Sequence, residues 1–338
     1  MIDLQTTWFL LVGVLLVGYA VLDGFDLGVG ALHLFLARTD RERRILLNSV
    51  GPVWDGNEVW LLTGGGAIFA AFPNVYATVF SGLYLALMLL LAGLIFRAVS
   101  LEFRSKNKSP RWRFGWDLAF SAGSFLPALL FGVAIGNVLR GLPIGSDGEF
   151  AGTFLGLLNP FALSVGLLAL AMFVMQGAAW LVLKTQGELQ ERSKKACFGS
   201  WAAFAALWVS VTLISRSAAP HQWIVYGRPL AWVVPVLFLF ATLGIPLALR
   251  RNRHGWTLTL TSAAIALLIA VMGLGLYPDM IPAAEASRSL TIYNSSSTSL
   301  TLKVMLAIAL FGMPIVVGYT AFIYSRFRGP VVLDDASY

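Results

Sequence analysis

Four carboxylates lie inside long apolar stretches of this sequence. Asp23 and Asp26 are three residues apart, and Asp55 and Glu58 repeat that spacing in the stretch "GPVWDGNEVW". Side chains three residues apart share one face of a helix. A charged side chain near the centre of a bilayer costs about 2.5–3.5 kcal/mol, so it normally faces a protein interior or a water-filled cavity. The spacing therefore predicts two acidic helix faces whose buried carboxylates could take up and pass on protons.

The composition shows what kind of protein must hold these acids. Hydrophobic residues make up 58% of the 338 residues, and charged residues make up only 12%. An ordinary soluble domain carries about 25% charged residues. We therefore expect residues 1–338 to form a single multi-pass membrane domain. The N-terminus lacks the basic segment of a cleaved signal peptide, so the first apolar stretch is expected to remain as a transmembrane helix.

Apolar stretches long enough to cross a bilayer predict an all-α fold with nine transmembrane helices, since a span needs about 20 residues. They lie near residues 8–36, 48–72, 75–98, 114–139, 160–183, 196–215, 230–249, 257–277 and 301–325. With these spans, nineteen of the 24 Lys and Arg residues fall on one side, which the positive-inside rule identifies as the cytoplasm. The N-terminus then lies outside and the C-terminus lies in the cytoplasm. We expect two four-helix bundles and one peripheral helix.

This topology orders the four acids by depth. With a rise of about 1.5 Å per residue, Asp55 lies roughly 10 Å from the cytoplasmic side, Glu58 and Asp26 roughly 15–17 Å, and Asp23 roughly 21 Å. The order suggests a series of carboxylates that leads inward from the cytoplasm. The alternative is that the acids pair with Arg, Trp or Asn side chains and only hold the helices together. The sequence leaves both interpretations open.

Other residues in these spans allow less specific interpretations. Trp54 could hold a ring-shaped ligand, although tryptophan near a membrane interface is usually a belt residue. Arg97 and Asp117 could pair across a helical hairpin, or Arg97 could extend its charged end to the interface. The three histidines do not lie in the middle of a predicted span, where a haem ligand would be expected. We therefore expect no metal site or haem ligand, and we interpret the single cysteine, Cys197, as a packing residue.

Longer motifs show a family resemblance that covers essentially the whole chain. The sequences "LDGFDLGVG" at 22–30, "RTDRERRILLNSVGPVWDGNEVWLLTGGGAIFAAFPNVYA" at 38–77 and "IFRAVSLEFRSK" at 95–106 carry it, with "RWRFGWD" at 111–117 and "SLTIYNSSSTSLTL" at 289–302. In these motifs the chain resembles subunit II of the cytochrome bd-type quinol oxidases, a family that includes a cyanide-insensitive branch.

The resemblance implies a function and a set of partners. Such a chain lies in the cytoplasmic membrane of a bacterium or archaeon and pairs with a subunit I that carries haems b and d. The complex oxidises quinol and reduces dioxygen to water. Subunit II supports subunit I and supplies a proton route from the cytoplasm. A small single-helix accessory subunit and a bound quinone are further expected partners, whereas nucleic acid is not.

The resemblance also implies roles for individual residues. Asp55 would be the carboxylate at which protons enter, and Asp23 and Asp26 would be further relay or structural acids. Arg97 and Asp117 match charged positions that matter for assembly or activity, and Trp54 would lie beside the quinone. A proton-coupled secondary transporter and a purely structural assembly subunit remain as alternatives. Transporters often have internal repeats, and none is evident in this sequence.

Overall fold

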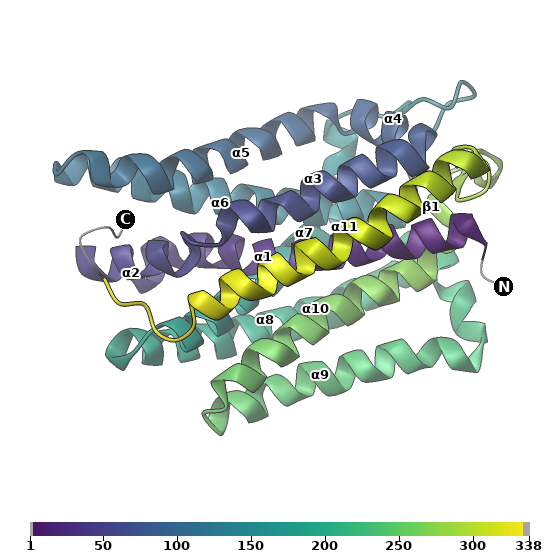
Figure 1. The fold of residues 1–338 in the computed structure, drawn as a ribbon. Coiled ribbons are helices and arrows are strands. Elements are labelled where there is room, and N and C mark those ends of the chain that lie inside the picture. The colour runs from purple at the N-terminus through teal and green to yellow at the C-terminus, as the bar shows by residue number, and fades with distance from the viewer. Residues whose placement is uncertain (1–2, 334–338) are drawn as a thin grey trace.

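The protein is an elongated bundle of helices that run along a common direction (Figure 1). The structure is a computed structural model and describes residues 3–333. Its α-helices are α1 (Leu4–Leu36), α2 (Asp40–Val50), α3 (Trp54–Ala71), α4 (Pro73–Gly82), α5 (Tyr84–Phe103), α6 (Pro110–Arg140), α7 (Pro160–Lys184), α8 (Gly187–Ala218), α9 (Val233–Arg250), α10 (His254–Leu276) and α11 (Ser299–Arg326).

Short elements complete the connections at the two ends of the bundle. The 3-10 helices are η1 (Arg104–Lys106), η2 (Leu155–Leu158), η3 (Pro220–Gly227), η4 (Pro229–Trp232) and η5 (Ala286–Arg288). The strands β1 (Asp279–Ile281) and β2 (Leu290–Thr291) pair antiparallel in the segment before α11. Ser297 in this segment donates its backbone N–H to the carbonyl of Ala71, so the connection covers the C-terminal end of α3.

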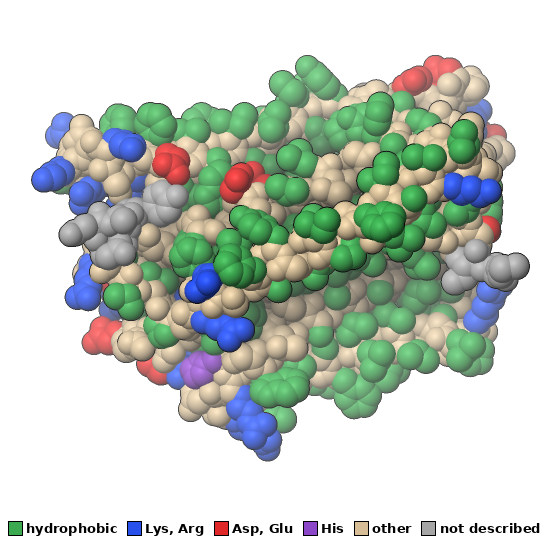
Figure 2. All heavy atoms as spheres, in the orientation of Figure 1, with side chains coloured by type: hydrophobic (Ala, Val, Ile, Leu, Met, Phe, Trp, Pro, Cys, Tyr) green, Lys and Arg blue, Asp and Glu red, His purple; other side chains and the backbone are tan. Residues whose placement is uncertain are grey.

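Within residues 3–333, eight helical segments are long and apolar enough to cross a membrane. They correspond to eight of the nine predicted spans, and the exception is the second one. That region is helical, but α3 has 18 residues and is not among the eight. Figure 2 shows hydrophobic side chains along the flanks of the molecule and most Lys and Arg side chains at its two ends. This distribution is the one that a bilayer requires of a multi-pass membrane protein.

The predicted second and third spans differ from the observed helices at their boundaries. The residues from 48 onward begin in α2, a separate polar helix that starts with a capping box between Thr39 and Glu42. Gly51 and Pro52 lie in the turn that separates α2 from α3. The third span is divided at Leu83, where α4 ends and α5 begins. The sequence prediction missed both breaks because it followed apolar character and not helix ends.

Helix α1 lies inside the bundle and packs against α3, α6 and α7. Two glycines allow α1 and α7 to approach closely. A Cβ atom on Gly28 would lie 1.9 Å from the backbone oxygen of Phe173, and one on Gly177 would lie 2.4 Å from the backbone of Gly28. Because any larger residue would push these helices apart, the glycines fix the place of α1, which carries Asp23 and Asp26.

Candidate functional site

Asp23 and Asp26 both point into the protein from the same face of α1. Their exposed fractions are 0% and 1%. A buried carboxylate needs a charged or hydrogen-bonding partner, since its desolvation is costly. The structure provides a different partner for each acid, and these partners come from helices that the sequence places far apart.

Arg97 of α5 connects the acids of α1 and α3. Its Nη2 donates to Oδ1 of Asp23 at 2.7 Å, and the same nitrogen donates to Oε1 of Glu58. Arg97 is 1% exposed, whereas the Glu58 side chain is 24% exposed. Both sequence interpretations of Arg97 were therefore wrong: it does not extend to the interface, and it does not pair with Asp117.

The charge that pairs with Asp117 across the hairpin is Arg104, seven residues after Arg97. Arg104 Nε donates to Oδ1 of Asp117 at 2.6 Å. Seven residues are about two helical turns, so Arg104 lies on the same face of the helix as Arg97 but nearer the turn between α5 and α6. The sequence prediction therefore misplaced the register of this hairpin by two turns.

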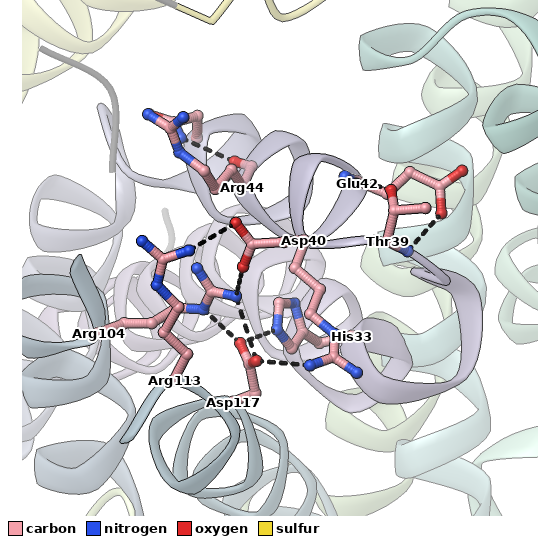
Figure 3. Close-up of polar contacts among 10 residues, drawn as sticks. His33, Thr39, Asp40, Glu42, Arg44, Arg104, Arg113 and Asp117 are labelled. Atoms are coloured by element: carbon pink, nitrogen blue, oxygen red, sulfur yellow. Dashed lines mark hydrogen bonds and ion pairs between the residues drawn. The ribbon is translucent and has the colours of Figure 1, made fainter. Parts of the chain in front are cut away.

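Asp117 is the centre of a second buried cluster at the end of the bundle where α2 lies (Figure 3). In addition to the hydrogen bond from Arg104, Asp117 accepts one from Nη1 of Arg43 at 2.9 Å. One of its oxygens also lies 2.7 Å from Nε2 of His33. Arg104 also donates to Asp40 at 2.8 Å, and Arg113 donates to the other oxygen of Asp40 at 2.9 Å. The cluster joins α1, α2 and α6 to the end of α5.

The pKa of Asp40, in the polar helix α2, shows how charges interact in this cluster. Burial favours the neutral form of Asp40, but the hydrogen bond from Arg104 and the charges of Arg104 and Arg113 outweigh it. They hold the pKa of this carboxyl below its usual value. Asp40 is therefore ionised at neutral pH, and it balances the positive charge of the cluster.

Sequence reasoning missed the role of His33, although a signal was present. His33 is seven residues after Asp26, so the two side chains lie on one face of α1, two turns apart. From the sequence, the three histidines were considered only as possible haem ligands. In the structure it is fully buried against Asp117.

Asp26 is bound through an amide and not through another acid. Asn57 Nδ2 donates to Oδ2 of Asp26 at 2.8 Å, and the Asn57 oxygen accepts a hydrogen bond from the Tyr324 hydroxyl at 2.9 Å. The sequence placed Asp26 and Glu58 at one depth. In the structure Asn57, the residue before Glu58, contacts Asp26, and Glu58 shares Arg97 with Asp23.

Asp55 and Trp54 occupy the first turn of α3. Asp55 is exposed, and Trp54 is half-buried against the core between α1, α2 and α7. Asp55, Glu58 and Asp23 therefore become progressively less exposed from the start of α3 toward the interior. A cavity lies beside the turn between α2 and α3. Pro52 and Val53 line it, but Trp54 does not.

Several buried polar atoms in the interior of the bundle have no hydrogen-bond partner within residues 3–333. They include the Tyr19 hydroxyl, Oδ2 of Asp23, Oδ1 of Asp26, Nε and Nη1 of Arg97, and Oε1 of Gln176. Buried polar groups nearly always bond to protein or to ordered water. Water bound to these atoms would satisfy them, and the Tyr19, Asp23, Asp26 and Arg97 atoms are the ones that belong to α1 and α5. In the same range of residues, no three His, Cys, Asp or Glu side chains are grouped to hold a metal ion.

Comparison with known proteins identifies the family of this chain. The family model described as "Cytochrome bd terminal oxidase subunit II" matches residues 4–327. The chain is 39% identical over 368 residues to the cytochrome bd-I ubiquinol oxidase subunit 2 of Escherichia coli (strain K12), covering 98% of this chain and 96% of the relative. It is 36% identical over 335 residues to the cytochrome bd ubiquinol oxidase subunit 2 of Bacillus subtilis (strain 168), covering 97% of each.

A solved structure shares the fold at low sequence identity. A chain of the bd oxidase from Geobacillus thermodenitrificans superposes with a TM-score of 0.80 and 17% identity, covering 96% of this chain and 99% of that one. The full-length sequence relatives and the family model together establish the family. This chain therefore belongs to the cytochrome bd terminal oxidase subunit II family, and it is a multi-pass membrane subunit of an oxidoreductase complex.

Proposed function

We propose that this chain is the non-haem subunit of a complex that oxidises quinol and reduces dioxygen to water. The relatives named as ubiquinol oxidase subunits support this assignment. Haems b and d would then be held by a partner subunit I.

We propose further that Asp55, Glu58 and Asp23 form a proton route toward the interior, with Asp26 beside it. Reduction of dioxygen to water consumes protons, which must reach a buried site. The exposed Asp55 can take up a proton from water, Glu58 lies one turn further along α3, and Asp23 is fully buried. The contact that Glu58 and Asp23 share with Arg97 is the observation that carries this proposal. Both carboxylates bind the same nitrogen of Arg97, so they lie close together.

The proposed direction of transfer requires a particular topology. We propose that α3 also crosses the membrane, giving nine spans with the N-terminus outside and the C-terminus in the cytoplasm. Its 18 residues give a length of about 27 Å, close to the ~30 Å of the hydrocarbon core. Helix α11 is then the peripheral helix beside two four-helix bundles, since only Leu302 of α11 is buried. A quinone beside Trp54 and a single-helix accessory subunit belong to the same proposal.

The other function that an observation favours is assembly alone. Arg97 joins α1, α3 and α5 by ion pairs, and this is what side chains that only hold helices together would do. The two functions differ in what Asp55 contributes, because Asp55 is exposed and forms no ion pair within residues 3–333. A structural role predicts no effect of its replacement.

The test is Asp55→Asn in the purified complex, reconstituted into vesicles and supplied with quinol. We expect oxygen consumption and proton uptake from the cytoplasmic side to fall together, by about tenfold or more. Glu188→Gln is the matched control, because Glu188 is an exposed acid of α8 outside the proposed route. Wild-type rates in an assembled Asp55→Asn complex would leave only the assembly function.

A further inference from the structure

A cavity of about 430 Å³ opens between the C-terminal ends of α7 and α11 and the turn between α2 and α3. Neither Arg97 nor any acid of the proposed proton route lines it. Its walls combine aromatic side chains, such as Trp180 and Tyr324, with the backbone of the segment that follows α11. A volume between about 300 and 1,000 Å³ is typical of a site that binds a small molecule.

Among the described residues 3–333, the charged side chains that line this cavity are all positive. Lys184, Arg326 and Arg328 line it, and no Asp or Glu of that range does. None of the three cations forms an ion pair with any residue in the described range 3–333. Elsewhere in this chain, buried cations such as Arg97 and Arg104 do have carboxylate partners. Within residues 3–333, the cavity therefore concentrates positive charge without a carboxylate counter-ion.

Lys184 is the innermost of these cations, with an exposed fraction of 6%. Its amine donates to the backbone oxygen of Phe327 and lies 4.8 Å from the centre of the Trp180 ring. An ammonium group has three N–H donors, so two remain for a ligand. A buried charge without an anionic partner is costly, and an anion in this cavity would remove that cost.

The segment after α11 makes the cavity a defined site. Phe327 accepts a hydrogen bond from the Lys184 side chain, and Val331 donates its backbone N–H to the Lys184 carbonyl at 2.9 Å. The chain between these two residues is thereby held against the end of α7. It carries Arg328, so the same two contacts keep this arginine at the cavity.

We infer that this cavity binds the phosphate of an anionic phospholipid head group through Lys184, Arg326 and Arg328. Arginine and lysine are the side chains that bind phosphate oxygens most strongly. The site lies at the end of α11, whose outer face is apolar, with Ile315 73% exposed and Phe322 52% exposed. An acyl chain attached to the phosphate would lie along that face, which a free phosphate ion would leave uncovered.

The test measures lipid binding to the purified oxidase complex. The complex is stripped of lipid and titrated with phosphatidylglycerol, phosphatidylcholine or inorganic phosphate, and the bound molecules are counted by native mass spectrometry. We expect saturable binding of one phosphatidylglycerol that phosphatidylcholine does not match. Arg328→Gln removes an exposed cation at the cavity and should weaken this binding about fivefold. Arg251→Gln, at an exposed position outside the cavity, should leave it unchanged.

Lys184→Gln should weaken the same binding, and Arg328→Gln keeps the test decisive if that buried variant does not assemble. Equal phosphatidylglycerol binding in Arg328→Gln and Arg251→Gln would overturn the assignment of these side chains. Binding of inorganic phosphate, lost in Arg328→Gln, without any specific phosphatidylglycerol would show that the occupant is a free phosphate and that the lipid assignment is wrong.

Discussion

Replacement of Arg97 tests how the two acidic helices are held together. In Arg97→Gln the guanidinium that contacts both Asp23 and Glu58 is lost. Asp23 is fully buried and has no other ion-pair partner within residues 3–333. Removing one member of a buried ion pair typically costs about 3–5 kcal/mol, because an uncompensated charge remains. At about 2 °C per kcal/mol for a large domain, the unfolding temperature should fall by about 6–10 °C.

The assay is thermal unfolding of the purified complex, with Arg113→Gln as the matched control. Arg113 also pairs with an aspartate, Asp40, but the two side chains are 29% and 47% exposed. Solvent screens such a pair, so its loss should cost about 0–1 kcal/mol. The double variant Asp23→Asn/Arg97→Gln should recover part of the loss, since it no longer buries an unpaired charge. If Arg97→Gln unfolds within 2 °C of Arg113→Gln, the bridging role assigned to Arg97 is wrong.

Three further changes give predictions of different kinds. Gly28→Ala should lower the free energy of unfolding by about 1–3 kcal/mol, because its Cβ would lie 1.9 Å from a backbone oxygen of α7. Gly66→Ala, with open space around it, should not lower it, and equal effects in thermal unfolding would contradict the packing argument. Tyr324→Phe should cost about 1 kcal/mol in denaturant unfolding by leaving the Asn57 oxygen without its donor, and no loss would show that this bond is unimportant. Burial raises the pKa of Asp279, so its ionised form reduces stability as the pH rises above the usual value. Asp279→Asn should therefore stabilise the protein at pH 7, by less than about 1 kcal/mol, and less at pH 4 in the same thermal assay; destabilisation at pH 7 would reverse this sign.

The sequence was sufficient to predict the membrane class and to single out the acids inside the apolar helices. Asp23, Asp26, Asp55 and Glu58 stand out because acids are rare in apolar helices, and the structure gives all but the exposed Asp55 a polar partner. Their partners could not be predicted in the same way. Arg97 contacts Asp23 across 74 positions of sequence, and such a contact depends on how the helices pack.

Local breaks in the helices explain most of the remaining errors. Helix α3 starts at Trp54 and not near residue 48, and the α3 side chain that contacts Asp26 is Asn57 and not Glu58. The hairpin between α5 and α6 put Arg104, and not Arg97, opposite Asp117. Each error is a shift along a helix, and a shift of one or two turns exchanges one side chain on a face for the next. The spacing between Asp26 and His33 predicts that both side chains lie on one face of α1. It does not predict that His33 contacts Asp117.

The central claim is that the acids of α1 and α3 carry protons from the cytoplasm into the oxidase. The most direct measurement is proton uptake during a single reaction of the reduced complex with dioxygen, followed by a pH indicator on the cytoplasmic side of oriented vesicles. The proton route predicts that uptake slows by about tenfold or more in Asp55→Asn and keeps its wild-type rate in Glu188→Gln. Uptake at the wild-type rate in both variants would contradict a route that begins at Asp55.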